Sequence, residues 1–430
     1  MLQMKMKESS AALPQPSPLG LLPSFGFGDR LGLATPGHIA ACRKGKLQAI
    51  FAQQSVREMT RTQRTPQEVM AAAQQGIQEE GWTGAWGADA DHLKNKQDVE
   101  NLAAAGFTFF TIDPSAYVQN QADGMKGAEI REAAEEVVRS GAFGSLKEVE
   151  NLYLNKPHPL PEAGELGFSE KEPLYRAVVK YGKAVAHTQK MSEWIGLATK
   201  GSGAEIEVSV DETDTPTSPA EHLFIGLELK RRGVRAVSVA PRFIGEFEKG
   251  IDYKGDLKTF EASLRQHVAI AKYCGPYKIS VHSGSDKFRI YPIIGRVCGN
   301  LLHVKTAGTS YLEALRVVAR KSPELFLQIV HYSRSRFDSD RATYHISAVL
   351  SEIKSPELLA PAEREKVYLD EDGGRQVLHV TFGSVLTLGK AANGRSFKDG
   401  ILETLHENEA LHREVLATHL GRHIQLLGAG

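Results

Sequence analysis

Short apolar runs recur along the chain, and most of them end in a polar cluster that leads into a helical pattern. Eight such runs are LQAIFAQQS, TGAWGADAD, FTFFTIDPS, IEVSVDETD, AVSVAPRF, YKISVHSGS, LLHVKTAG and VLHVTFGS. Their richness in Val, Ile and Phe is typical of strands buried in a parallel sheet. About eight strand–helix units favour an α/β fold of the (β/α)8 TIM-barrel type over an open doubly wound sheet. The stretch LGLAT, residues 31–35, could be a ninth strand or the true first one.

Helix starts and stops are marked between these runs. Residues 65–68 (TPQE) form a capping box with proline at the first helical position, residues 218–221 (SPAE) repeat it, and residues 310–313 give a third. Glycines stand where helix ends are expected, at Gly106, Gly233 and Gly275. These signals support the alternation of strands and helices that a barrel requires.

The spacing of the elements predicts one catalytic domain. Residues 1–18 read as a flexible lead, and residues 19–430 as a single barrel domain. Residues 114–202 hold several helical patterns and no good strand, so we expect a helical insertion there. A second insertion is expected between LLHVKTAG and VLHVTFGS, and two helices from Phe397 onward.

Composition excludes several classes of protein. The 430 residues are 41% hydrophobic, and Lys+Arg and Asp+Glu are both 52, so no net field draws the chain to nucleic acid or a membrane. There is no unbroken apolar stretch of membrane-spanning length and no secretory signal. The three cysteines lack metal or disulfide spacing. We expect a cytoplasmic enzyme with a small-molecule substrate and no nucleic-acid or membrane partner, and a homo-oligomer is compatible with the sequence.

Polar residues are dense at the ends of the predicted strands, where barrel enzymes place their active sites. The clusters are Gln53, Gln54, Ser55 and Arg57, then Asp89, Asp91 and His92, then Asp113, Asp211, Glu212, Arg242, His282, Ser283, His303 and Lys305. One such cluster is weak evidence, but charge and imidazole at seven strand ends are hard to explain by packing alone.

Three histidines suggest a metal site. Strand alternation puts His282 on the polar face of its run and places His303 and Lys305 together on the polar face of theirs. If the aliphatic faces meet the helices, both histidines point into the barrel and can join His92. Imidazole ligands with carboxylates nearby suit a divalent ion such as Zn, Mn, Ni, Co or Fe. A hydrogen-bonded core histidine is the alternative for any one of them.

Three further histidines carry less weight. His379 is a fourth candidate, but it lacks polar partners nearby in the sequence. His419 and His423 have the i,i+4 spacing of a metal pair on a helix, yet no acid accompanies them. We expect those two to lie on a solvated helix face.

The carboxylates supply candidates for proton transfer. Asp91 and Glu212 lie on different strands, as acid/base pairs usually do, although the residues alone do not choose between Asp211 and Glu212. Asp113 is either a turn residue or part of the site.

The stretch TAGTS, residues 306–310, enters a helix and offers a seat for a carboxylate or phosphate, helped by Lys305 and Arg242. The glycine-rich stretch GFGDRLG has the wrong spacing for a dinucleotide site, so we expect no NAD.

Several long motifs together resemble the tagaturonate epimerase family. They are SFGFGDRLGLATPGH, FAQQSVRE, GADADH, FTIDPS, VSVDETDTPTSP, RFIGEFEKGIDYKGDL, HSGSDKF, HVKTAGTSYLEA and YHIS. The resemblance implies a metal-dependent 4-epimerase that interconverts D-tagaturonate and D-fructuronate, and some relatives accept fructose and tagatose. It implies Asp91 as proton acceptor, Glu212 as proton donor, and the metal ligands His92, His282 and His303. Candidate substrate-binding residues are Gln54, Asp113, Arg242 and Lys305.

The chemistry of C4 narrows the mechanism. The C4 hydrogen of a 2-ketose is not adjacent to the carbonyl, so simple deprotonation is difficult. A retro-aldol cleavage between C3 and C4 needs one base, one acid and one metal, which the candidate residues supply. Transient oxidation or stepwise enolisation would also invert C4. The alternatives are a metal-dependent ketose isomerase or 3-epimerase, and a non-catalytic barrel that binds sugar acids.

Overall fold

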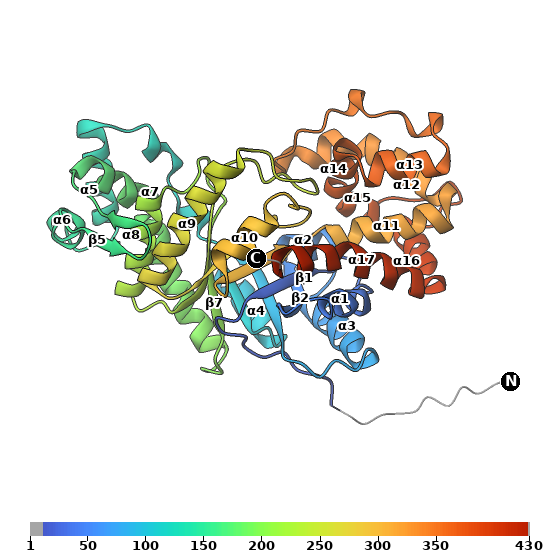
Figure 1. Cartoon of the computed structure of the whole chain (residues 1–430), viewed down its shortest axis with the longest axis horizontal. Helices are drawn as coiled ribbons and strands as arrows, with labels where there is room; N and C mark the ends of the chain where they lie inside the picture. Colours follow the sequence, from blue (N-terminus) through green and yellow to red (C-terminus); the bar gives the residue numbers. More distant parts are fainter. Residues whose placement is uncertain (1–11, 429–430) are drawn as a thin grey trace.

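A closed barrel of eight parallel strands forms the centre of the protein in the computed structural model, which describes residues 12–428 (Figure 1). The order around the barrel is β1, β10, β9, β8, β7, β4, β3 and β2. The strands are β1 Ser24–Gly28, β2 Gln48–Ser55, β3 Trp86–Leu93, β4 Phe109–Ile112, β7 Glu205–Val210, β8 Ala236–Pro241, β9 Lys278–Val281 and β10 Leu302–Thr306. The prediction of a (β/α)8 barrel is therefore confirmed.

One of the eight predicted strands is wrong. The run VLHVTFGS belongs to two helices, α14 (Asp372–Val380) and α15 (Phe382–Thr387). A fully buried helix and a buried strand give similar short apolar runs, and periodicity alone does not separate them. Seven predicted strands are present, so one strand of the barrel had to come from elsewhere.

The missing strand is β1, whose sequence SFGFG precedes the stretch that was considered as an alternative. Residues 31–34 form no strand, and Thr35 already begins α1. Glycine is a poor strand former, so the two glycines of SFGFG masked the strand pattern of β1 in the sequence. Gly28 is needed for close approach, since a Cβ there would lie 2.7 Å from the backbone of Ala307.

Helices follow the strands and cover the outside of the barrel. Their bounds up to β10 are α1 Thr35–Cys42, α2 Val56–Thr62, α3 Pro66–Glu79, α4 Lys96–Ala104, α5 Gly127–Arg139, α6 Leu146–Tyr153, α7 Lys171–Ala198, α8 Pro219–Arg231, α9 Leu257–Cys274 and α10 Tyr291–Cys298. The capping boxes at Thr65 and Ser218 are confirmed. The third is wrong, because α11 already begins at Thr309 and the Ser310 hydroxyl bonds His38 instead.

Two helical additions lie at opposite ends of the long axis of the molecule (Figure 1). Between β4 and β7, the chain forms α5, α6, α7 and a small hairpin of β5 (His158–Leu160) and β6 (Gly164–Leu166). After β10 the chain forms only helices joined by loops, with a second hydrophobic core. The helices there are α11 Thr309–Lys321, α12 Pro323–Asp340, α13 Pro361–Leu369, α14, α15, α16 Phe397–Glu407 and α17 Glu409–Gly428. The two helices predicted from Phe397 onward are confirmed.

Residues 1–11 of the predicted lead lie outside the described residues, but Ser17 is already tied to the barrel. Its N–H donates to the carbonyl of Trp86 at the start of β3. Among residues 12–428, no helix is long and apolar enough to cross a membrane.

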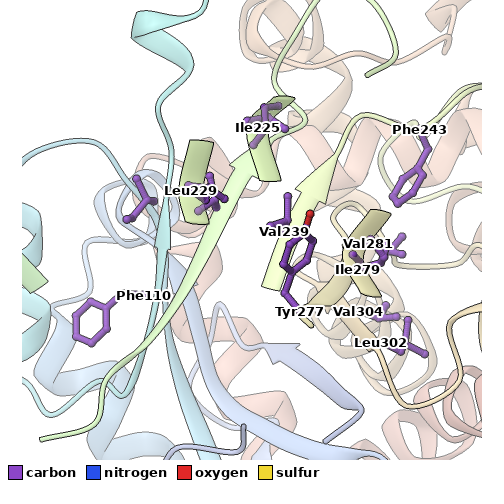
Figure 2. Packing of buried hydrophobic residues seen from close by; sticks show 14 of the residues in the cluster. Phe110, Ile225, Leu229, Val239, Phe243, Tyr277, Ile279, Val281, Leu302 and Val304 are labelled. Atoms are coloured by element: carbon purple, nitrogen blue, oxygen red, sulfur yellow. The ribbon is translucent and has the colours of Figure 1, made fainter. Parts of the chain in front are cut away.

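The aliphatic faces of the strands meet the surrounding helices. Figure 2 shows Val239, Ile279 and Val304 among the buried residues of this layer, with Leu229 of α8 nearby. The polar residues that alternate with these aliphatic residues along each strand therefore face the barrel interior, as the strand pattern predicts. Lys305 and His303 both approach side chains of other strands across that interior.

Candidate active site

At the carboxyl end of β3, the neighbouring residues Asp91 and His92 both line one cavity. Asp89 and Asp91 face inward by alternation, whereas Ala88 and Ala90 pack outside. The backbone of His92 then has φ of 55°, and the pairing with β4 shifts register between Ala90 and Leu93. This irregularity ends the alternation, so that Asp91 and His92 both line the cavity.

Lys305 of β10 lies among three carboxylates in the barrel interior. Its ammonium is 2.7 Å from Asp89, 2.8 Å from Asp91 and 2.9 Å from Glu207 of β7. These carboxylates outweigh the effect of burial and hold the pKa of Lys305 well above its ordinary value. The ammonium is thus fully engaged by the protein itself.

Asp89 and Asp91, two of the acids around Lys305, have pKa values shifted in opposite directions. Burial favours the protonated form of each, and for Asp89, with Asp91 and Glu207 close by, it raises the pKa. For Asp91, Lys305 and His92 outweigh burial and lower the pKa, so that this carboxylate stays ionised. An ionised carboxylate at the cavity wall can accept a proton.

Two imidazoles and a carboxylate form a group that could hold a metal ion. The donor atoms of His92, Asp211 and His282 all lie within 4.8 Å of one another. Burial lowers the pKa of His282, but Asp211 at 3.3 Å and Glu207 at 2.7 Å raise it to about 10. Surroundings that retain a proton on an imidazole so firmly also favour a metal cation in its place.

Asp113 orients the imidazole of His92. Its Oδ2 lies 3.4 Å from Nδ1 of His92 and 3.2 Å from the ammonium of Lys94. Burial is outweighed by the hydrogen bond to His92, which lowers the pKa of Asp113. With Nδ1 held in this way, Nε2 of His92 remains on the side of Asp91, 3.8 Å away.

His303 lies apart from this group, deeper in the barrel. Its Nδ1 is 2.9 Å from the hydroxyl of Ser24, and its ring packs 5.2 Å from that of Phe109. Burial lowers the pKa of His303 to about 3, so the ring is neutral. Among the groups of metal-ligating residues in residues 12–428, none includes His303.

The remaining predicted residues surround the cavity at different depths. Glu212 lines it and is more exposed, with Arg57 at 3.7 Å and Lys94 at 3.9 Å. Arg242 lines only the adjoining outer part of the cavity. Gln54 is buried and lines a separate small cavity beside Asp29, whereas its neighbour Gln53 lines the main one.

Two side chains of the cavity, Lys249 and Tyr344, were not among the predicted residues, and His379 was only a weak candidate. Lys249 comes from the loop between β8 and α9, and its ammonium donates to the Ser283 hydroxyl at 2.6 Å. Tyr344 and His379 come from the helical region after β10. A lysine followed by glycine in a loop at the carboxyl end of a strand was the available signal for Lys249.

The expectation that His419 and His423 lie on a solvated helix face is wrong. Helix α17 returns to pack on α1, α10 and α11, and His423 is fully buried. Both imidazoles approach Asp286, which also pairs with Arg375 at 2.8 Å. Although this trio could hold a metal, the Arg375 guanidinium already supplies the positive charge, so we interpret it as a structural tie.

The chain matches a family model described as tagaturonate epimerase over residues 5–427. It is 45% identical over 415 residues to the tagaturonate/fructuronate epimerase of Thermotoga maritima, covering 96% of this chain and 82% of that protein. The native crystal structure of fructuronate-tagaturonate epimerase UxaE from Cohnella laeviribosi superposes with a TM-score of 0.90 at 38% identity, covering 96% of this chain and 83% of that one. A glycerol complex of the same enzyme gives the same values. This chain belongs to the tagaturonate epimerase family and is an isomerase of the epimerase class.

Proposed function

We propose that this protein interconverts D-tagaturonate and D-fructuronate by inversion at C4, with a divalent metal ion at His92, Asp211 and His282. The observation that carries the proposal is the position of the ionised Asp91 beside this donor group, in a member of the family. Two nitrogens and one oxygen suit Zn, Mn, Ni, Co or Fe. His303, which the resemblance implies as a ligand, is the alternative to Asp211 as third donor.

The metal, when bound, would act as a Lewis acid that stabilises negative charge on substrate oxygen atoms. Asp91 accepts the proton of the C4 hydroxyl. As that proton leaves, the C3–C4 bond breaks, C4 becomes an aldehyde carbon, and the bonding electrons remain on the C2–C3 fragment as an enediolate. Lys305 holds Asp91 in place through their 2.8 Å contact.

Inversion follows when the aldehyde rotates and presents its other face to C3. The C3–C4 bond re-forms, and the alkoxide generated at C4 takes a proton. Glu212 is the proposed donor, because it lines the cavity and its side chain is 36% exposed, so that solvent can reach it. Asp113 fixes the His92 ring. Gln54 and Arg242 line neighbouring cavities, so neither is assigned a contact with the reacting carbon atoms.

A direct assay tests this function. The purified protein is incubated with D-tagaturonate, and the formation of D-fructuronate is followed by NMR, with fructose and tagatose in parallel reactions. Conversion of the uronate supports the proposal. Failure to convert the uronate or either hexulose, with divalent ions supplied, would contradict it and favour a non-catalytic barrel that binds sugar acids.

A further inference from the structure

The substrate of the proposed function carries a carboxylate at C6, and the cavity must provide a cation for it. Four cationic side chains line the cavity that contains Asp91 and His92: Arg30, Arg57, Lys249 and Lys305. Because the reacting bond joins C3 and C4, the C6 carboxylate lies two carbons beyond C4, within reach of other side chains of the same cavity. The candidates are the cationic side chains that are not already paired with a carboxylate of the protein.

Three of the four are already committed. Lys305 contacts three carboxylates. Arg30 pairs with Glu58 at 2.7 Å, and its guanidinium stacks 3.5 Å above the ring of Phe382. The side chain of Arg57 is 47% exposed and shares Glu212 with Lys94, so solvent screens much of its charge.

Lys249 differs from the other three. It is partly buried, and no carboxylate of residues 12–428 contacts its ammonium, whose hydrogen bond goes to the neutral hydroxyl of Ser283. That hydroxyl accepts from Lys249, so its own proton remains free for another acceptor. An ammonium and a hydroxyl proton side by side match the two oxygens of a carboxylate. A partly buried cation without a counter-ion is costly, and an anionic substrate would relieve that cost.

We propose that Lys249, together with Ser283, binds the C6 carboxylate of the uronate and sets the preference for uronates over neutral hexuloses. This inference rests on the proposed function. The sequence suggested that Lys305 and the TAGTS stretch bind the substrate carboxylate. The proposal assigns this role instead to the loop between β8 and α9. Arg242 is the alternative candidate, because its side chain also has no ion pair among the described residues, but it lines only the adjoining cavity and not the one that contains Asp91 and His92.

The test compares Lys249→Met, Lys249→Arg, Ser283→Ala and the matched Arg242→Met variant. We measure kcat and KM for D-tagaturonate and D-tagatose, using tagatose as a competitive inhibitor if it is not turned over. For Lys249→Met we expect kcat/KM for the uronate to fall about 30-fold or more, mainly through KM. The KM or inhibition constant of tagatose should change less than about threefold, and Lys249→Arg should restore part of the uronate preference.

Equal losses for both sugars in Lys249→Met, or loss of the uronate preference in Arg242→Met alone, would overturn the assignment. Melting temperatures of the variants separate misfolding from loss of binding, and the exposed Lys190→Met serves as a charge-removal control. If the wild-type protein turned over only tagatose, the uronate function would fail instead, and Lys249→Met would show no preference to lose.

Discussion

Asp91 and His92 are neighbours in the sequence that line the same cavity, because the backbone of His92 adopts φ of 55° at the end of β3. In a regular strand the two side chains would face opposite sides of the sheet. The left-handed backbone places a proton acceptor beside an imidazole of the candidate metal group, 3.8 Å apart. Non-glycine residues adopt this conformation rarely, and at active sites it is often part of the function.

The first prediction concerns the proposed base. Asp91→Asn removes the proton acceptor but keeps the shape of the side chain, so kcat for D-tagaturonate should fall about 10²- to 10⁴-fold. Bound metal should be retained, as mass spectrometry can verify. The exposed Asp338→Asn on α12 is the control. Full turnover by Asp91→Asn would remove Asp91 from the mechanism.

A second prediction separates Asp211 from His303 as the third metal ligand. Asp211 lies with His92 and His282, whereas His303 is bonded to Ser24 deeper in the barrel. We expect Asp211→Asn to lose bound metal after dialysis and His303→Gln to keep it, as measured by metal analysis of the purified variants. The opposite result would assign the third ligand to His303, as the family resemblance implies.

The third prediction distinguishes retro-aldol cleavage from enolisation. Breaking C3–C4 moves only the hydroxyl proton, so D-fructuronate formed in D2O should carry no deuterium on carbon. Proton transfer at carbon, as in a ketose isomerase or 3-epimerase, would incorporate solvent deuterium. Mass spectrometry and NMR of the product report which occurs. Stoichiometric deuterium on C3 would contradict the proposed route.

The fourth prediction concerns the tie between α17 and the loop after β9. Burial lowers the pKa of His419, but Glu313 and Asp286 outweigh it and raise the pKa above its ordinary value of 6.5. A histidine whose pKa is raised in the folded state stabilises the fold fully below pH 6.5. That contribution is lost as the pH rises through the folded-state pKa. His419→Gln should therefore lower stability by about 2 kcal/mol at pH 6 and by less at higher pH.

Melting curves of wild type and His419→Gln from pH 6 upward measure this difference directly. The exposed His406→Gln on α16 is the control for the substitution itself. A constant difference between wild type and His419→Gln across that range would mean that His419 does not bind its extra proton in the folded protein.

Much of the barrel could be predicted from the sequence, because Val- and Ile-rich strands followed by capped helices leave a strong pattern. The exceptions have physical causes. In β1, Gly26 leaves room for the Gln53 side chain and Gly28 lets the backbone of Ala307 approach closely, but both glycines weaken the strand signal. In α14, the polar residues Arg375 and Gln376 precede the apolar run VLHV, so the run by itself resembled a short buried strand. The C-terminal histidines were misassigned because their acid, Asp286, lies far away in the sequence.

The site was predictable only where strand ends converge. Asp91, His92, His282 and Lys305 meet because parallel strands end on the same side of a barrel. The depth of His303 depends on the stagger between strands, which the sequence does not encode locally. Lys249 comes from a loop, where periodicity carries no information about direction.

The most direct measurement is a chelation and add-back assay with D-tagaturonate, following D-fructuronate. We expect dialysis against a chelator to abolish turnover and a divalent ion to restore it, because His92, Asp211 and His282 form the proposed metal group. Unchanged turnover in protein that metal analysis shows to be free of divalent ions would contradict the account.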